Sequence, residues 1–331
     1  VHGSRLFPFA QSPLCHRTSL SMPLYSLVAF TALSSPCAGG SVSFMRESLS
    51  KDSNNQILVE GTDLTKAFGS VRALDGLDLS VKAGSVHGFL GPNGAGKTTA
   101  IRAILGQIRL DGGRLRVFGR DPVKDAVDVH RRLAYVPGDT VLWPNLTGGE
   151  CIDILGRMQG SIDAARRAEL IERFELNPRM KTRTYSKGNR QKVALVAALA
   201  TRAELLLLDE PTSGLDPVMA ERFVETVREA QGSGATVLLS SHIMSEVAAL
   251  CDTVTVLRRG RAAYSGSLEG VRARADVAVS AVGRTGEPIS LNVPSAEADS
   301  AIAGLLKGGA SIRKVESSLE AAFLSFYKGE K

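Results

Sequence analysis

From residue 57 onward, the chain alternates short apolar runs with stretches whose apolar residues recur at helical spacing. Six such runs, each bounded by polar or glycine-containing turns, predict strands at residues 57–59, 77–81, 85–90, 205–208, 236–240 and 254–257. Helical spacing predicts helices at residues 98–108, 163–174 and 192–200. Strands that alternate with helices indicate an α/β fold in which helices cover the faces of a parallel sheet.

The first 54 residues differ from this pattern: they are rich in Ser and Pro and carry no charge between Arg17 and Arg46. Their most apolar part, residues 24–33, is about half as long as the roughly 20 residues that cross a bilayer. That length fits the apolar core of a secretory signal peptide, and the segment also fits a dispensable or mis-started tail. We favour the tail, because Pro36 stands where a small residue would aid signal cleavage.

The pattern changes again near residue 275. Short strands are expected at residues 277–282, 288–293 and 311–317, with helices at 296–306 and 319–327. We therefore expect three segments, which are a disordered or mis-started tail over residues 1–54, a main domain over 55–275 and a small α+β module over 276–331.

Composition excludes several classes of protein. The 331 residues are 44% hydrophobic and 22% charged, which is ordinary for a globular protein and excludes a mostly membrane-spanning, disordered or collagen-like chain. The net charge of +6 permits an acidic partner but does not require one. The four cysteines lie far apart without a metal-binding spacing, which favours a reducing compartment.

A glycine-rich segment carries the strongest chemical signal. It matches G-x-x-x-x-G-K-[ST] in full and stands between a predicted strand and a predicted helix, as a phosphate-binding loop does. Backbone N–H groups of such a loop surround a phosphate, and a flexible turn would leave the lysine and the hydroxyl without a purpose. The predicted nucleotide-binding residues are Gly91, Pro92, Asn93, Gly94, Ala95, Gly96, Lys97, Thr98 and Thr99.

Two carboxylates follow the apolar run 205–208 at the edge where parallel sheets bind ligands. Asp209 is expected to support Mg²⁺, to which the Thr98 hydroxyl is also expected to bind. Glu210 points in a different direction and is the candidate general base for the attacking water. A strand that merely ends in a charged turn is common, so the pair gains its weight from the phosphate-binding loop.

These motifs, together with Tyr185-Ser186-Lys187-Gly188-Asn189-Arg190-Gln191, resemble the ATP-binding subunits of ABC transporters over residues 57–267. The resemblance implies an ABC-type ATPase fold of the P-loop NTPase class, with a parallel-sheet core, an antiparallel β subdomain and a helical subdomain at about residues 138–190. It also implies ATP and Mg²⁺ as cofactors. In that family the signature sequence, here 185–191, binds the γ-phosphate of ATP held by the opposite subunit, which assigns that role to Ser186 and Gly188.

Three further residues take their expected roles from the same resemblance. Residues 213–216 match the family's D-loop, so Asp216 is expected near the nucleotide at the interface between subunits. His242 matches the histidine that contacts the γ-phosphate, and we expect it to be catalytic. Phe68 falls where the family stacks an aromatic ring on adenine, and simple core packing explains Phe68 nearly as well.

The chain departs from the family pattern at two positions. Lys187 replaces a glycine of the signature sequence, so its side chain must point away from the nucleotide or add a positive charge near it. The Y-S-K-G form resembles the branch of two-component exporters of drugs, antibiotics and lipids. The glutamine of the family's Q-loop is replaced by Gly138 and Asp139, and we expect Asp139 to take over the contact with Mg²⁺.

The resemblance also implies partners. A separate membrane permease is expected, because residues 142–147 resemble the family surface that receives the coupling helix of the permease. This segment contains Trp143, which core packing would also explain. Two chains are expected to form a head-to-tail homodimer, or a heterodimer with a paralogous subunit, at the cytoplasmic face of the membrane. No nucleic acid partner is expected. The alternatives are a regulatory module that binds ATP and a non-transport ATPase of the same superfamily.

Overall fold

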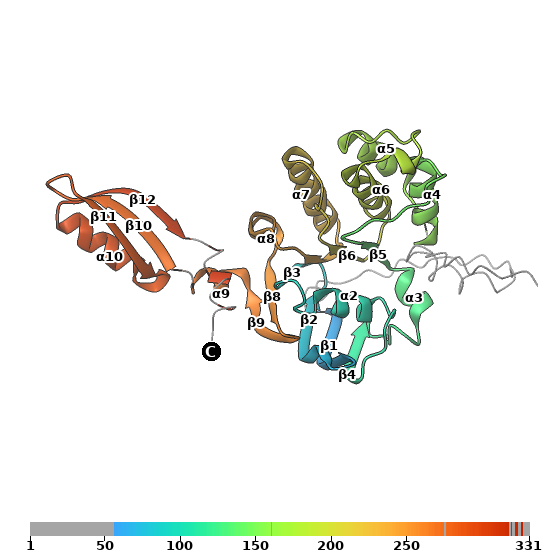
Figure 1. Ribbon diagram of the computed structural model, residues 1–331, viewed down its shortest axis with the longest axis horizontal. Helices are drawn as coiled ribbons and strands as arrows, with labels where there is room; N and C mark the ends of the chain where they lie inside the picture. The colour runs from blue at the N-terminus through green and yellow to red at the C-terminus, as the bar shows by residue number, and fades with distance from the viewer. Residues whose placement is uncertain are drawn as a thin grey trace, which may run out of the picture. The chain divides into compact units, whose positions relative to one another are not determined.

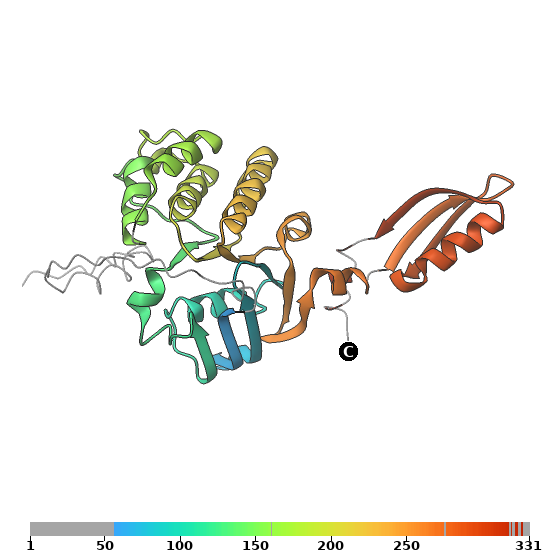
Figure 2. The same ribbon diagram turned by 180° about the vertical axis from the view of Figure 1, so that it is seen from behind.

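The computed structural model describes residues 56–159, 161–274 and 276–317, together with Leu319, Ala322, Phe323 and Phe326. The predicted tail and most of the predicted closing helix therefore lie outside the described residues. Figures 1 and 2 show helices and sheets arranged in layers over residues 56–272. Within the described part of the chain, no helix is both long enough and apolar enough to cross a bilayer.

A six-stranded sheet forms the centre of this part, in the order β5-β6-β7-β3-β8-β9. Five of its strands are parallel, and β9 runs antiparallel to β8 at one edge. The strands are β3 (Val86–Leu90), β5 (Leu133–Val136), β6 (Leu205–Asp209), β7 (Thr236–Ser240), β8 (Thr253–Arg258) and β9 (Arg261–Ser267). The predictions of strands at 85–90, 205–208, 236–240 and 254–257 are confirmed, whereas β5 and β9 were not predicted.

A second sheet is antiparallel and has the order β2-β1-β4. It contains the two predicted strands at 57–59 and 77–81, both of which are longer than predicted: the strands are β1 (Ile57–Phe68), β2 (Val71–Lys82) and β4 (Gly112–Val117). Helix α2 (Lys97–Ile104) lies between the two sheets and shares one apolar core with both of them. The predicted helix 98–108 is therefore too long. It stops near Gly106, which has φ 66° and packs against the Pro122 carbonyl.

The opposite face of the six-stranded sheet is covered by helices, as Figures 1 and 2 show. Helix α5 begins after Asp163, whose carboxylate caps it by accepting from Ala165 N and Arg166 N, which confirms the predicted helix at 163–174. The predicted helix at 192–200 is present and begins five residues earlier. The remaining helices of this part are α3 (Ala126–His130), α4 (Gly148–Met158), α5 (Ala164–Arg173), α6 (Lys187–Leu199), α7 (Pro217–Gly232), α8 (Met244–Leu250) and α9 (Leu268–Arg272), with a 3₁₀ turn η2 (Thr182–Thr184). Helix α3 is not on the opposite face, because its Val129 packs in the core that α2 shares with the two sheets.

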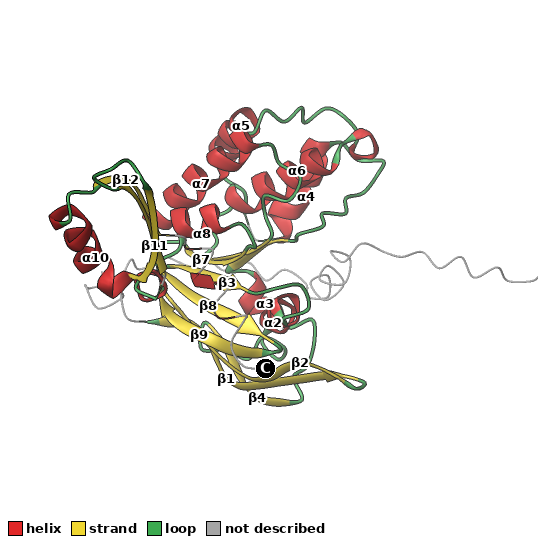
Figure 3. Cartoon of the chain, turned by 60° about the vertical axis from the view of Figure 1, so that its left-hand side comes forward, coloured by secondary structure: helices red, strands yellow, loops and turns green. Residues whose placement is uncertain are grey.

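The C-terminal residues form a separate small sheet in the order β11-β10-β12, with α10 against one of its faces (Figure 3). Its strands and helix agree with those predicted: β10 (Asp276–Val282), β11 (Pro288–Pro294), β12 (Ser311–Ser317) and α10 (Ser295–Lys307). Val277 and Val279 of β10 and Ala298 of α10 are the buried centre of its core. Alternate residues of β10 are buried, as is typical of a strand with one face on a core.

Candidate nucleotide-binding site

The glycine-rich loop connects β3 to α2 at the carboxyl edge of the six-stranded sheet. Gly94 and Gly96 have φ angles of 80° and 113°, which side-chain-bearing residues rarely adopt. A Cβ at Gly96 would also lie 2.5 Å from the Ala73 carbonyl oxygen. Within the described residues, no side chain caps the start of α2, so its first N–H groups are available to an anion.

Lys97 lies at the start of α2 and is buried, with 7% of its surface exposed. Its Nζ donates to the carbonyl oxygens of Gly91 at 2.5 Å and of Pro92 at 3.2 Å. Burial lowers the pKa of Lys97, and the negative charges of Glu210 and Asp209 act in the opposite direction. The structure therefore brings this lysine within electrostatic range of both predicted carboxylates.

Those carboxylates stand at the carboxyl end of β6, as predicted. Asp209 is buried, and burial raises the pKa of its carboxyl group. Glu210 has φ 46°, a left-handed conformation that is uncommon for a residue with a side chain. Its N–H donates to the Ser240 carbonyl oxygen at 2.8 Å, which joins the ends of β6 and β7. This turn directs the two neighbouring acids differently.

His242 follows β7, and its Nδ1 lies 3.5 Å from Glu210 Oε1. The His242 side chain is 63% exposed and that of Glu210 is 31% exposed, so both groups are accessible to a ligand and to water. A carboxylate and an imidazole at this separation are suited to orient a water molecule and an anion beside it. The structure therefore groups Lys97, Asp209, Glu210 and His242 at one edge of the sheet.

The residue that replaces the family's glutamine lies against the same acids. A Cβ at Gly138 would be 3.1 Å from the Asp209 carbonyl oxygen and 3.4 Å from Glu210 Cβ. Asp139 beside it is exposed. Gln191, which the sequence analysis named only as the last residue of the signature sequence, anchors this loop from α6: its Nε2 donates to the Pro137 carbonyl oxygen at 3.1 Å. Its Oε1 accepts from Thr140 Oγ1 at 2.8 Å. Gln191 stands in the polar run 187–192 of α6, so nothing in the sequence signalled that its side chain is fully buried.

The chemistry of the donor set suits a hard cation. Among the described residues, no three or more His, Cys, Asp or Glu side chains are grouped closely enough to hold a metal ion by themselves. Mg²⁺ commonly uses one or two protein oxygens and takes the rest of its ligands from nucleotide phosphates and water. Thr98 in α2 and Asp209 in β6 supply such oxygens, and α2 contacts β6. This donor set therefore fits a magnesium ion held largely through a nucleotide.

The signature sequence forms the start of α6, as predicted. Ser186 is the N-cap, and its Oγ accepts from Asn189 N at 3.2 Å. Gly188 packs directly on the D-loop segment, since a Cβ there would come within 3.0 Å of the Gly214 carbonyl oxygen. Lys187 points to that segment as well, and its Nζ donates to Ser213 Oγ at 2.8 Å. The structure thus joins the signature sequence to the D-loop segment of the same chain.

Two predicted ligand residues have further contacts. Asp216 caps α7 by accepting from Met219 N at 3.0 Å, and this hydrogen bond lowers the pKa of its carboxyl group. Phe68 is 51% exposed at the end of β1, which excludes core packing as its role. Lys66 Nζ lies 5.4 Å from the centre of the Phe68 ring, so the ring face carries a nearby positive charge.

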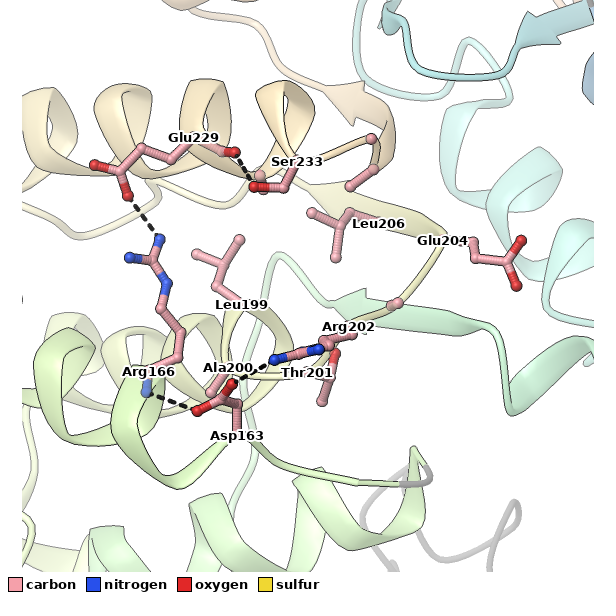
Figure 4. A pocket seen from close by; sticks show the side chains of 14 residues that line it. Asp163, Arg166, Leu199, Ala200, Thr201, Arg202, Glu204, Leu206, Glu229 and Ser233 are labelled. Carbon is pink, nitrogen blue, oxygen red and sulfur yellow. Dashed lines mark hydrogen bonds and ion pairs between the residues drawn. The ribbon is translucent and has the colours of Figure 1, made fainter. Parts of the chain in front are cut away.

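A pocket of about 620 Å³ lies elsewhere, next to the start of β6 (Figure 4). Four of its charged side chains are paired within the pocket, Arg166 with Glu229 at 2.7 Å and Arg202 with Asp163 at 3.2 Å. None of the predicted site residues lines it. The candidate nucleotide-binding site is thus an accessible edge at the other end of the strand, separate from this pocket.

Comparison with known proteins agrees with this arrangement. The sequence pattern of the family described as "ABC transporter" matches residues 74–213. The daunorubicin resistance ATP-binding protein DrrA3 of Streptomyces coeruleorubidus is 39% identical over 245 residues, which cover 71% of this chain and 77% of that protein. The chain belongs to the ABC transporter family. Within this family it is an ATP-binding subunit and an ATPase, which confirms the predicted fold class and the predicted resemblance.

Other members of the family extend the comparison. The bacitracin transport ATP-binding protein BcrA of Bacillus licheniformis is 35% identical, over 62% of this chain and 68% of that protein. A solved structure of an ATP-binding subunit of an ABC transporter has a TM-score of 0.61 and 30% identity, over 65% of this chain and 92% of that one. A bacterial Atm1-family ABC exporter with ATP bound has a TM-score of 0.59 and 26% identity, over 67% of this chain and 41% of that one.

Proposed function

We propose that this ABC ATPase powers a separate membrane permease that exports drugs, antibiotics or lipids. The cargo class is supported by the names of relatives that are 35–39% identical, which are a daunorubicin resistance protein and a bacitracin transport protein. It is also supported by the Y-S-K-G form of the signature sequence at residues 185–188. The site of action is the cytoplasmic face of the membrane, where the permease and cytosolic ATP meet.

The catalytic centre forms between two chains arranged head to tail. Each chain carries two separate groups of residues: the phosphate-binding loop with Asp209, Glu210 and His242, and the signature sequence with the D-loop segment. ATP bound to the first group of one chain is closed over by Ser186 and Gly188 of its partner. Helix α6 presents its N-terminal N–H groups there, and such groups attract phosphate. ATP binding thereby stabilises contact between the two chains, and their closure drives the permease.

Within that centre each residue has a distinct task. The loop from Gly91 to Thr99 binds the phosphates and Phe68 stacks on adenine, while Lys97 neutralises charge on the β- and γ-phosphates. Thr98 and Asp209 hold Mg²⁺, which supplies charge stabilisation when it is bound. Glu210 accepts a proton from the attacking water, and His242 contacts the γ-phosphate. The 3.5 Å distance between Glu210 and His242 is the observation that most supports hydrolysis.

The permease binds at the segment 142–147. Trp143 in this segment is half-buried and Val141 beside it is 51% exposed, so an apolar surface is available to a partner. The Trp143 carbonyl oxygen accepts from Thr182 Oγ1 at 2.5 Å, which fixes the segment against η2.

Measurement of phosphate release distinguishes between two functions of this chain, a transport ATPase and a regulatory module that binds ATP. Wild-type protein and Glu210→Gln are compared with saturating ATP and magnesium, each with and without the reconstituted permease. Loss of at least about 100-fold of the rate in Glu210→Gln supports the proposed chemistry, since an essential general base contributes about 10²- to 10⁴-fold. Equal rates for wild type and Glu210→Gln would favour the binding module. The control is Glu225→Gln, which changes an acid in α7.

Asp139 is the proposed replacement for the family's Q-loop glutamine. Asp139→Ala should raise the magnesium concentration that gives half-maximal hydrolysis, because one oxygen ligand is lost. Asp128→Ala changes another exposed aspartate, in α3, and should leave the magnesium dependence unchanged. A magnesium dependence that is the same in Asp139→Ala and wild type rules out this role for Asp139.

A further inference from the structure

We propose that Glu246 is a positioning residue, which holds the segment that carries His242 and the start of the D-loop segment in one fixed arrangement. Glu246 belongs to α8, and none of the roles described above uses it. The inference rests on the proposed role of His242. The experiment below distinguishes failure of the role of Glu246 from failure of the role of His242.

Glu246 is a buried acid with only 5% of its surface exposed. Its Oε2 accepts from Ser241 Oγ at 2.8 Å, and its Oε1 accepts from Thr212 Oγ1. Ser241 and Thr212 are 1% and 6% exposed, so all three polar side chains are shielded from water. Burying an acid costs free energy unless hydrogen bonds compensate, and each of its oxygens has one such bond here.

The two hydroxyl partners lie directly before two different functional elements, Ser241 before His242 and Thr212 before the D-loop segment. Ser241 immediately precedes His242, and its Oγ also accepts from Ile243 N at 3.0 Å. The Ser241 hydroxyl therefore links the residues on either side of His242, and its hydrogen bond to Glu246 holds that hydroxyl in place. This arrangement constrains the backbone at His242 and thereby the direction of its side chain.

Thr212 lies two residues after Glu210 and immediately before the D-loop segment. Ser213 N donates to the Glu210 carbonyl oxygen at 3.1 Å, and Ser213 Oγ accepts from Lys187 Nζ. A continuous set of contacts therefore runs from the His242 segment through Glu246 to the D-loop segment. Displacing Glu246 would remove this side-chain link and leave the two segments joined only through the backbone at the ends of β6 and β7.

An acid in the first turn of a helix has an ordinary explanation, which is attraction to the positive end of the helix dipole. Glu269 in the first turn of α9 fits that explanation, because its side chain is 82% exposed. The Glu246 side chain is instead buried and binds residues from two other segments. Glu269→Ala is therefore the control: it removes an acid from the first turn of a short helix without touching either segment.

Glu246→Ala, Glu246→Gln and Glu269→Ala are compared by ATP affinity and by turnover per folded molecule. We expect Glu246→Ala to reduce kcat about tenfold while the Kd for ATP changes less than about threefold, because the phosphate-binding loop is untouched. Glu246→Gln should recover most of the rate, since an amide can accept from one hydroxyl and donate to the other. Glu269→Ala should resemble wild type.

A double substitution provides the decisive comparison. If Glu246 acts through His242, Glu246→Ala should lower kcat by less than about threefold in a His242→Ala background. Full additivity of the two losses, or an unchanged kcat per folded molecule in Glu246→Ala, would overturn the inference. Wild-type activity in His242→Ala alone would instead remove the proposed role of His242, and the inference about Glu246 would fall with it.

Discussion

Gly188→Ala tests the contact between the signature sequence and the D-loop segment. Gly188 has an ordinary helical backbone, so an alanine is permitted by its dihedral angles and raises helix propensity by about 1 kcal/mol. The new Cβ would lie about 1 Å inside an ordinary contact distance from the Gly214 carbonyl oxygen. The obstacle is therefore the neighbouring backbone and not the conformation of Gly188.

The magnitude follows from two opposing effects. Overpacking costs about 1–3 kcal/mol, and the gain in helix propensity offsets about 1 kcal/mol of it. The free energy of unfolding should therefore fall by no more than about 2 kcal/mol. Activity should fall much further, by about 100-fold in kcat, because a shift of about 1 Å misplaces both the signature sequence and the D-loop segment.

The assay combines urea unfolding with steady-state phosphate release. Gly232→Ala is the control, because this glycine ends α7 and a Cβ there would meet nothing within 4 Å. The control should keep wild-type turnover and be slightly more stable. Wild-type turnover in Gly188→Ala would show that this contact does not position the two segments for catalysis. A loss of activity fully explained by unfolding would show the same.

Two further predictions concern Lys187 and His87. Lys187→Met removes the hydrogen bond to Ser213 and should lower kcat about threefold to tenfold. Lys187→Arg keeps a donor, so its kcat should stay near wild type. Additive losses of kcat in the double variant Lys187→Met, Ser213→Ala would contradict this prediction. Burial holds the pKa of His87 at about 4, below the value of about 6.5 expected when unfolded. The unfolded chain then binds more protons, so the free energy of unfolding should fall by up to about 3 kcal/mol as the pH drops from about 6.5 to 4. Urea unfolding at several pH values should show a weaker dependence in His87→Gln, and an identical dependence would contradict the prediction.

The phosphate-binding loop and α6 were predictable because short-range chemistry determines them. The loop needs glycines with left-handed dihedral angles immediately before a lysine, and these residues are adjacent in the chain. Ser186 caps α6 through a residue three positions away. The apolar run of β6 is buried on both faces, so it stands out in the sequence.

The features that were missed depend on contacts between distant residues. The bond from Lys187 to Ser213 joins residues 26 positions apart, and that from Thr212 to Glu246 joins residues 34 apart. No periodicity in the sequence encodes such pairs. Strand β9 consists largely of small and polar residues and forms no distinct apolar run. Strand β5 is a four-residue apolar run that the sequence analysis passed over.

Sedimentation velocity of the Glu210→Gln protein shows whether two chains share the active site, because this substitution should preserve bound ATP. We expect a dimer with saturating ATP and magnesium and a monomer without nucleotide. The double variant Glu210→Gln, Gly188→Ala should form a weaker dimer. A protein that stays monomeric with saturating ATP and magnesium, even beside its permease, would contradict the account of an active site shared between two chains.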